Sequence, residues 1–144
     1  MRLSENPNYR NYLTRREAKD YAGAIESLRA CIGDLRGDQY EVMFRADILQ
    51  RIGDLQLEQG EREAAFASHE HALRTDSASL LVKLHFVKFL ARAGELPRAI
   101  EECDRISKIA EEAPFAGSVE DFGSDYYARE AQKLKESFTK RSTQ

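Results

Sequence analysis

The residues that could carry out chemistry are few, and the most suggestive lie in the run His69-Glu70-His71. Histidine is a common zinc ligand and can act as a general acid or base near neutral pH. Residues two positions apart point to nearly opposite sides of a helix, so these two imidazoles would not share one metal ion. A zincin motif would also need histidine at position 73, where the chain has Leu73. We therefore predict that His69 is a buried core residue and that the chain holds neither a metal nor a cofactor.

The other reactive side chains also lack the partners that catalysis needs. Cys31 and Cys103 form no CxxC pair, and both fall where a helical pattern places a mid-sized buried side chain. The run Asp121-Phe122-Gly123 has the letters of the magnesium-binding motif of protein kinases. The glycine-rich loop, the strand lysine and the catalytic loop that accompany this motif are absent from the sequence. The sequence thus predicts no catalytic residues, and we expect that the protein is not an enzyme.

Composition and charge exclude further classes of protein. The chain has 144 residues, 42% hydrophobic and 33% charged, which suits one globular domain spanning 1–144. Its 22 basic and 25 acidic residues give a net charge of -3, without the basic segment that a nucleic-acid partner requires. The stretch richest in large apolar residues, 80–90, is interrupted by Lys83, His85 and Lys88, so we expect no membrane partner. The N-terminal residues lack the apolar segment of a secretion signal, and we expect a reduced, cytoplasmic protein.

A repeat with an offset of 34 residues organises the middle of the chain. Gly60 recurs as Gly94, and Ala65 recurs as Ala99. An earlier unit shares the second half of the pattern at an offset of 41, with Ala24 in the place of Ala65. Self-similarity at a period of this length is typical of proteins built from stacked supersecondary units. The repeat units span about 5–38, 46–79 and 80–113.

Within each unit the apolar residues recur at helical spacing. Gly60 and Gly94 interrupt the pattern and can adopt the positive φ that often ends a helix. Asp20 suits the N-cap of one helix, and Asp38 with Glu41 suits a capping box at the start of the next. We expect seven helices and no strand. The helices are predicted over about 7–18, 21–35, 38–59, a segment that follows Gly60, 80–93, 96–110 and 118–140.

The spacing of particular residues in these units resembles the tetratricopeptide repeat, a 34-residue helix–turn–helix unit. The matching positions are Leu49, Ile52, Gly53, Gln56, Ala65 and His69 in the middle unit, and Phe86, Leu90, Ala99 and Cys103 in the third. The opening helix of the first unit departs from the pattern, with Asn8 and Asn11 at apolar positions. The resemblance implies an all-α, right-handed α-α superhelix, or solenoid, of three units. The helix at 118–140 would cap the stack, because a terminal repeat needs a polar outer face.

Proteins that resemble this family hold a peptide or a partner helix on the concave surface lined by the first helix of each unit. The residues that this places in the groove are Asp47, Gln50, Arg51, Asp54, Leu57, Leu81, Leu84, His85, Lys88 and Arg92. Acids on one helix and bases on the next would favour a ligand of mixed charge. Members that bind chaperone tails carry lysine and asparagine where this chain has Tyr9 and Leu13. In addition, Asp47 and Asp54 would repel a carboxylate. We therefore do not expect the chain to bind the C-terminal carboxylate of a chaperone.

Two classes of function remain open from the sequence. The first is an adapter or scaffold that binds a peptide or helix of a partner protein in its concave groove. The second is a self-associating structural module, a homodimer without a separate peptide ligand. The oligomeric state of the purified protein discriminates between them. The sequence does not identify the partner.

Overall fold

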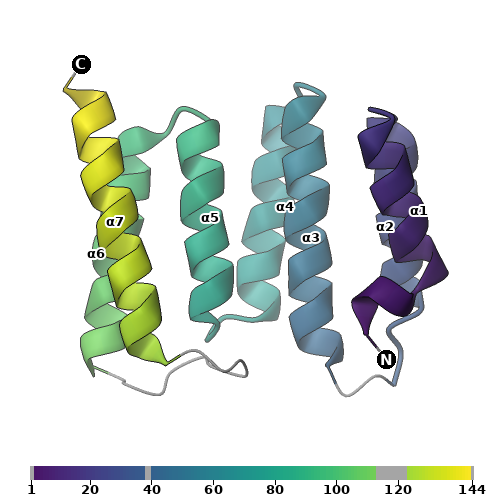
Figure 1. Ribbon diagram of the computed structural model, residues 1–144, viewed down its shortest axis with the longest axis horizontal. Helices are drawn as coiled ribbons and strands as arrows, with labels where there is room; N and C mark the ends of the chain where they lie inside the picture. Colours follow the sequence, from purple (N-terminus) through teal and green to yellow (C-terminus); the bar gives the residue numbers. More distant parts are fainter. Residues whose placement is uncertain (1, 38–39, 113–122, 144) are drawn as a thin grey trace. The chain divides into compact units, whose positions relative to one another are not determined.

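The computed structural model describes residues 2–37, 40–112 and 123–143. Over these residues the chain forms seven α-helices, one turn of 3-10 helix and no β-strand, so the all-α prediction is confirmed (Figure 1). The elements are η1 (Leu3–Glu5), α1 (Pro7–Glu17), α2 (Tyr21–Gly33), α3 (Glu41–Glu58), α4 (Arg62–Thr75), α5 (Leu80–Arg92), α6 (Leu96–Glu112) and α7 (Ser124–Ser142).

The chain divides into two compact units, unit 1 at Met1–Asp76 and unit 2 at Ser77–Gln144. The boundary falls close to the predicted junction between the repeats 46–79 and 80–113. In unit 1, α1 packs against α2, α2 against α3, and α3 against α4. Figure 1 shows α1 and α3 in front of α2 and α4. In unit 2, α5 packs against α6, and α7 packs against both of them.

Local sequence signals explain most of the helix boundaries. The Asp20 carboxylate accepts a hydrogen bond from the Gly23 amide at 3.0 Å and caps the start of α2, as predicted. Gly60 and Gly94 follow the ends of α3 and α5 with φ of +81° and +83°. A residue with a Cβ would be strained in this left-handed conformation. Pro97 lies in the first turn of α6, where a missing amide proton breaks no helical hydrogen bond.

Two predicted helix starts differ from the structure or lie outside it. The N-cap of α3 is Tyr40, whose side chain makes no capping hydrogen bond, and the predicted cap Asp38 lies outside the described residues. The last helix is described from Ser124 and continues to Ser142, two residues beyond the predicted end at 140. The predicted start at 118 lies outside the described residues.

Small residues allow the paired helices to approach closely. Ala24, Ala65 and Ala99 are each 0% exposed, as expected for the inner face of a helix pair. The core of unit 1 combines Ala24 with large side chains of α1, α2 and α3. Its buried members are Tyr9, Tyr12, Ala24, Ile25, Leu28, Cys31, Leu35, Ile48, Ile52 and Leu55.

Helix α4 packs closely against α3 at Gly53. A Cβ atom at this position would lie 2.5 Å from Cδ2 of His69 and 3.0 Å from the carbonyl oxygen of Ala65. The imidazole of His69 therefore fills the space that a larger residue would need. His69 is 0% exposed, which confirms the prediction that it belongs to the core. Its Nε2 atom lies 3.0 Å from Oδ1 of Asp54.

Candidate functional site

The predicted groove residues are divided between two helices that belong to different units. Five lie on α3 and five on α5. Gln50 and Leu84 are buried, each with 3% of its surface exposed, which corrects the expectation that their side chains face an open groove. The reason at Leu84 is its helical stripe, because Leu80 and Val87, four residues before it and three after, are also buried. A glutamate at position 84 would therefore disturb the fold.

The remaining predicted residues are exposed to different degrees. Asp54 contacts the buried His69, so its carboxylate helps to hold α4 against α3. The others on these helices are Leu57, Leu81 and His85, which are half-buried, and Lys88 and Arg92, which are exposed. Within unit 1 the structure brings Asp47 and Arg51 together, since Nε of Arg51 donates to the Asp47 carboxylate at 2.9 Å.

A cluster of tyrosines and arginines joins α1 to α3 in unit 1; we call Tyr9, Tyr12, Arg16, Asp47 and Arg51 the tyrosine–arginine cluster. Arg16 donates a hydrogen bond to the Tyr12 hydroxyl at 2.9 Å, and Arg51 donates to the same oxygen at 3.5 Å. The guanidinium carbon of Arg51 lies 5.6 Å from the centroid of the Tyr9 ring. Guanidinium groups are attracted to aromatic faces at such distances. The two arginines therefore converge on one phenol from two helices.

The electrostatics of this cluster follow from partial burial and from one carboxylate. Burial acts to lower the pKa of Arg51, but the charge of Asp47 and its hydrogen bond outweigh this and raise that pKa above its usual value. Burial raises the pKa of Tyr9, and the nearby charge of Arg51 opposes that rise. Arg51 thus remains a cation and Tyr9 a neutral phenol near neutral pH. The cluster holds two guanidinium groups and one carboxylate, and Asp47 pairs with Arg51, so one positive charge is uncompensated within the cluster.

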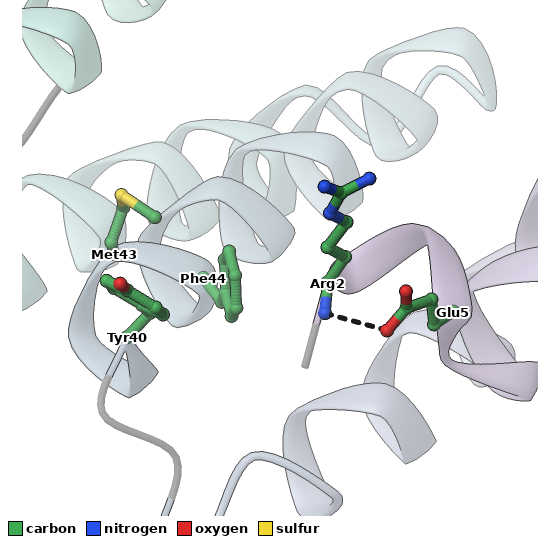
Figure 2. A pocket seen from close by; sticks show the side chains of 5 residues that line it. All are labelled: Arg2, Glu5, Tyr40, Met43 and Phe44. Carbon is green, nitrogen blue, oxygen red and sulfur yellow. Dashed lines mark hydrogen bonds between the residues drawn. The ribbon is translucent and has the colours of Figure 1, made fainter. Parts of the chain in front are cut away.

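An open hollow of about 380 Å³ lies at the start of α3 in unit 1. We call it the apolar hollow; Figure 2 shows Tyr40, the N-cap residue of α3, with Met43 and Phe44 of α3 on one side, and Arg2 and Glu5 on the other. The Arg2 amide donates to the Glu5 carboxylate at 3.2 Å. The ring of Tyr40 lies 5.9 Å from the ring of Phe44. One side of the hollow is therefore formed by two aromatic rings and a thioether. The other side carries two side chains of opposite charge.

One of the two large hydrophobic side chains that are exposed to solvent in the described part of the chain, Tyr40, lines this hollow. Tyr40 is 41% exposed and Val42 is 55% exposed. They sit immediately before and within the first turn of α3. A contiguous exposed apolar surface is costly in water and commonly marks a binding surface.

The hollow and the cluster lie along one face of α3. Phe44, Asp47 and Arg51 follow the spacing i, i+3, i+7, which keeps them on one helical stripe. The rise of an α-helix places Phe44 and Arg51 about 10 Å apart along the axis. On α1 the residues Tyr9, Tyr12 and Arg16 repeat the same spacing. We call this surface the α1–α3 face.

Sequence reasoning missed most of this face. It included Asp47 and Arg51 in the groove but omitted Tyr12, Arg16 and the residues of the hollow. One signal was present, because an aromatic residue precedes an arginine by seven positions both at Tyr9 and at Phe44. The sequence did not show that the two stripes meet, which depends on how α1 packs beside α3.

The two cysteines behave as the sequence predicts, as buried thiols. Burial, together with Asp34 and Asp47, raises the pKa of Cys31 to about 11. Burial and the neighbouring Asp104 raise the pKa of Cys103 to about 11 as well. Both thiols are therefore protonated near neutral pH, and the thiolate is the reactive form.

Comparison with known proteins adds no relative. No family model, curated protein or solved structure matches the chain. The resemblance to tetratricopeptide repeats thus rests on the repeat spacing and stays a prediction. Over residues 2–37, 40–112 and 123–143, no three histidine, cysteine, aspartate or glutamate side chains are grouped to hold a metal ion. Over the same residues no helix has the length and apolar character needed to span a membrane.

Proposed function

We propose that this protein is an interaction module that binds a peptide or a helix of a partner protein. The observation that carries the proposal is the apolar hollow lined by the exposed Tyr40 and by Met43 and Phe44. An apolar side chain of the partner would fill the hollow and remove these surfaces from water, which is the main favourable term in peptide recognition. Anchors of this kind dominate the energy of small interfaces.

We also propose that the chain is a tetratricopeptide-like array in which the helix pairs stack into a right-handed superhelix. The 34-residue offset supports this, because Gly60 and Gly94 adopt nearly the same φ and Ala65 and Ala99 are equally buried. In such an array the first helices of successive units line the concave surface. Asp47 and Arg51 of the predicted groove then belong to the α1–α3 face. The exposed Lys88 and Arg92 of α5 stay predicted contacts of the same ligand.

A peptide library displayed on phage and selected on the immobilised full chain tests the proposal. We expect selected peptides to share a large apolar residue and to lose about tenfold in affinity for Tyr40→Lys, because a charge in the lining of the hollow resists burial. Ala67→Lys is the matched control, since it adds the same charge at an exposed position of α4. That variant should keep the affinity of wild type.

Two outcomes would contradict the adapter proposal. One is that selection enriches no peptide. The other is that sedimentation shows a dimer for wild type and a monomer for Tyr40→Lys. The second result would mean that another copy of this chain covers the hollow, as in the self-associating alternative.

A further inference from the structure

We infer that unit 1 binds an acidic segment of its partner. An aspartate or glutamate carboxylate of that segment accepts hydrogen bonds from Arg16 and Arg51, while an apolar side chain of the same segment occupies the apolar hollow. The inference rests on the function proposed above and names the chemistry of the ligand.

Arg16 is oriented by Tyr12 but has no ionic partner among the described residues. Its side chain is exposed, and its guanidinium contacts the hydroxyl and the ring of Tyr12, 5.3 Å from the ring centroid. Both contacts are with a neutral side chain, and no carboxylate of the described residues forms an ion pair with Arg16. Tyr12 is 2% exposed, so its hydroxyl is a fixed point that orients the guanidinium. The cation is thus positioned without being neutralised.

Arg51 is held in place by two tyrosines and one carboxylate. Its guanidinium is held over the Tyr9 ring and against the Tyr12 hydroxyl, with Asp47 on one edge. Because Arg16 donates to the same hydroxyl, both guanidiniums lie within hydrogen-bond distance of one oxygen atom. A guanidinium presents several N–H donors in a planar fork that matches a carboxylate. An incoming carboxylate can therefore accept bonds from both arginines at once.

The net positive charge of the two arginines and Asp47 favours a carboxylate over a phosphate as the bound anion. Asp47 already compensates one of the two guanidiniums, which leaves a single positive charge for the ligand. A carboxylate carries one negative charge and matches this, whereas a phosphate carries nearly two near neutral pH. The sequence predicts that Asp47 would repel a carboxylate. In the structure its charge is directed at Arg51, which reduces that repulsion. Asp54, the other predicted repulsive group, is directed at His69.

Spacing connects the acidic group to the apolar one. Phe44 borders the hollow, and Arg51 lies about 10 Å further along α3. A strand rises about 3.3 Å per residue, so an extended ligand would carry its acid three residues from its apolar anchor. A helical ligand parallel to α3 would carry it seven residues away. The recognised pattern is therefore an apolar residue and an acid at one of these two spacings.

The experiment uses the full chain and capped twelve-residue peptides that hold one leucine and one glutamate three positions apart among serines and glycines. Titrations followed by fluorescence polarisation compare this peptide with its glutamine counterpart. We expect the glutamine peptide to bind about fivefold more weakly, because it loses a charge-assisted contact at a partly exposed site. Raising the salt to about 0.5 M should reduce the difference, since exposed charges are screened.

Variants locate the effect. Arg16→Gln should weaken the glutamate peptide by about fivefold and leave the glutamine peptide unchanged. Asp47→Asn should strengthen the glutamate peptide, because a repulsive charge is removed. Arg10→Gln is the matched control, because it removes the same charge from an exposed position of α1 that lies off the stripe of Tyr9, Tyr12 and Arg16. That control should leave both peptides unchanged.

Different results separate this inference from the proposed function. If Tyr40→Lys abolishes binding of both peptides but Arg16→Gln and Asp47→Asn change neither, the acidic ligand is overturned and the adapter function stands. Equal effects of Arg10→Gln and Arg16→Gln overturn the local site in favour of a diffuse charge effect. A phosphoserine peptide that binds more than tenfold better than the glutamate peptide overturns the choice of a carboxylate. If neither peptide binds and phage selection enriches none, both proposals fail.

Discussion

The α3–α4 and α5–α6 helix pairs correspond position by position in the sequence, but the contacts between their helices are made by different side chains. Positions 34 residues apart correspond, and Ala65 and Ala99 are buried to the same degree. In α3–α4 the small residue Gly53 faces the large His69. The corresponding positions in α5–α6 carry Val87 and Cys103, which are 0% and 1% exposed. The bulk is therefore on the second helix in one pair and shared between the helices in the other.

The surroundings of these positions differ in polarity as well. In α3–α4, Ser68 donates to the buried Gln56 at 2.6 Å, and Asp54 contacts His69. The position that corresponds to Gln56 is the fully buried Leu90. A buried polar group is costly without a partner, and the first pair supplies one for Gln56 and for Nε2 of His69. Corresponding contacts of the two helix pairs are thus filled by different types of residue, polar in one pair and apolar in the other.

The largest expected effect comes from the positions that the two pairs share. Ala65→Arg and Ala99→Arg each force a long charged side chain between close-packed helices, and we expect either to lose several kcal/mol (roughly 3–5) of stability or to unfold. Circular dichroism melting measures the loss. Hydrogen exchange shows which helix pair is affected.

Ala67→Arg is the control for this prediction, because Ala67 is exposed on the same helix as Ala65. We expect its melting midpoint to match wild type within a few degrees. A folded Ala65→Arg protein with an unchanged midpoint would show that the correspondence between the two pairs is wrong.

An intermediate effect is expected where the pairs differ. Gly53→Val gives α3 the residue of α5 and should cost about 3 kcal/mol, because the new side chain overlaps the imidazole of His69. Adding His69→Cys reproduces the combination Val87 with Cys103. We expect the double variant to be more stable than the sum of the single changes by about 1–2 kcal/mol.

Urea denaturation of the two single variants and the double variant closes this cycle. The Ala65 carbonyl oxygen also lies close to the added Cβ, so recovery should be incomplete. Strictly additive free energies of unfolding would mean that Gly53 and His69 do not share one space, and that the exchange of bulk between the pairs is coincidental.

The smallest effect concerns the two buried thiols, one in each unit. With the pKa of Cys31 and of Cys103 at about 11, against 9.0 for an ordinary cysteine, the thiolate fraction at pH 8 is about a hundredfold lower than in the unfolded chain. We expect iodoacetamide to alkylate both residues at least that much more slowly in the native protein than in urea. Mass spectrometry of the digested protein reads each site separately.

The same shifts have a consequence for stability with a defined sign. Burial favours the protonated thiol, so the contribution is complete below pH 9 and is lost as the pH rises towards about 11. The free energy of unfolding should fall over that range, and less so in Cys103→Ala. Rapid alkylation of Cys103 but not Cys31 at pH 8 would show that the two units open with different ease.

Some features of the structure could be predicted from the sequence and others could not. The helix breaks at Gly60 and Gly94 and the cap at Asp20 are local signals, and the structure has them where they were predicted. The burial of His69 was also predictable from its repeat position. The burial of Gln50 and Leu84 was not predictable, because a helix packed on more than one side has no single outward face.

The sequence by itself determined the all-α class, the number of helices over the described residues, most of their boundaries, and the small residues at which helices pair. These depend on spacing and backbone preference within a few residues of the chain. Only the tertiary structure brought Tyr12 and Arg16 of α1 to Arg51 of α3, and η1 to the start of α3 beside Tyr40. Such contacts depend on how two helices distant in sequence are rotated and offset against each other. That is a property of the packed side chains together, and no single segment encodes it.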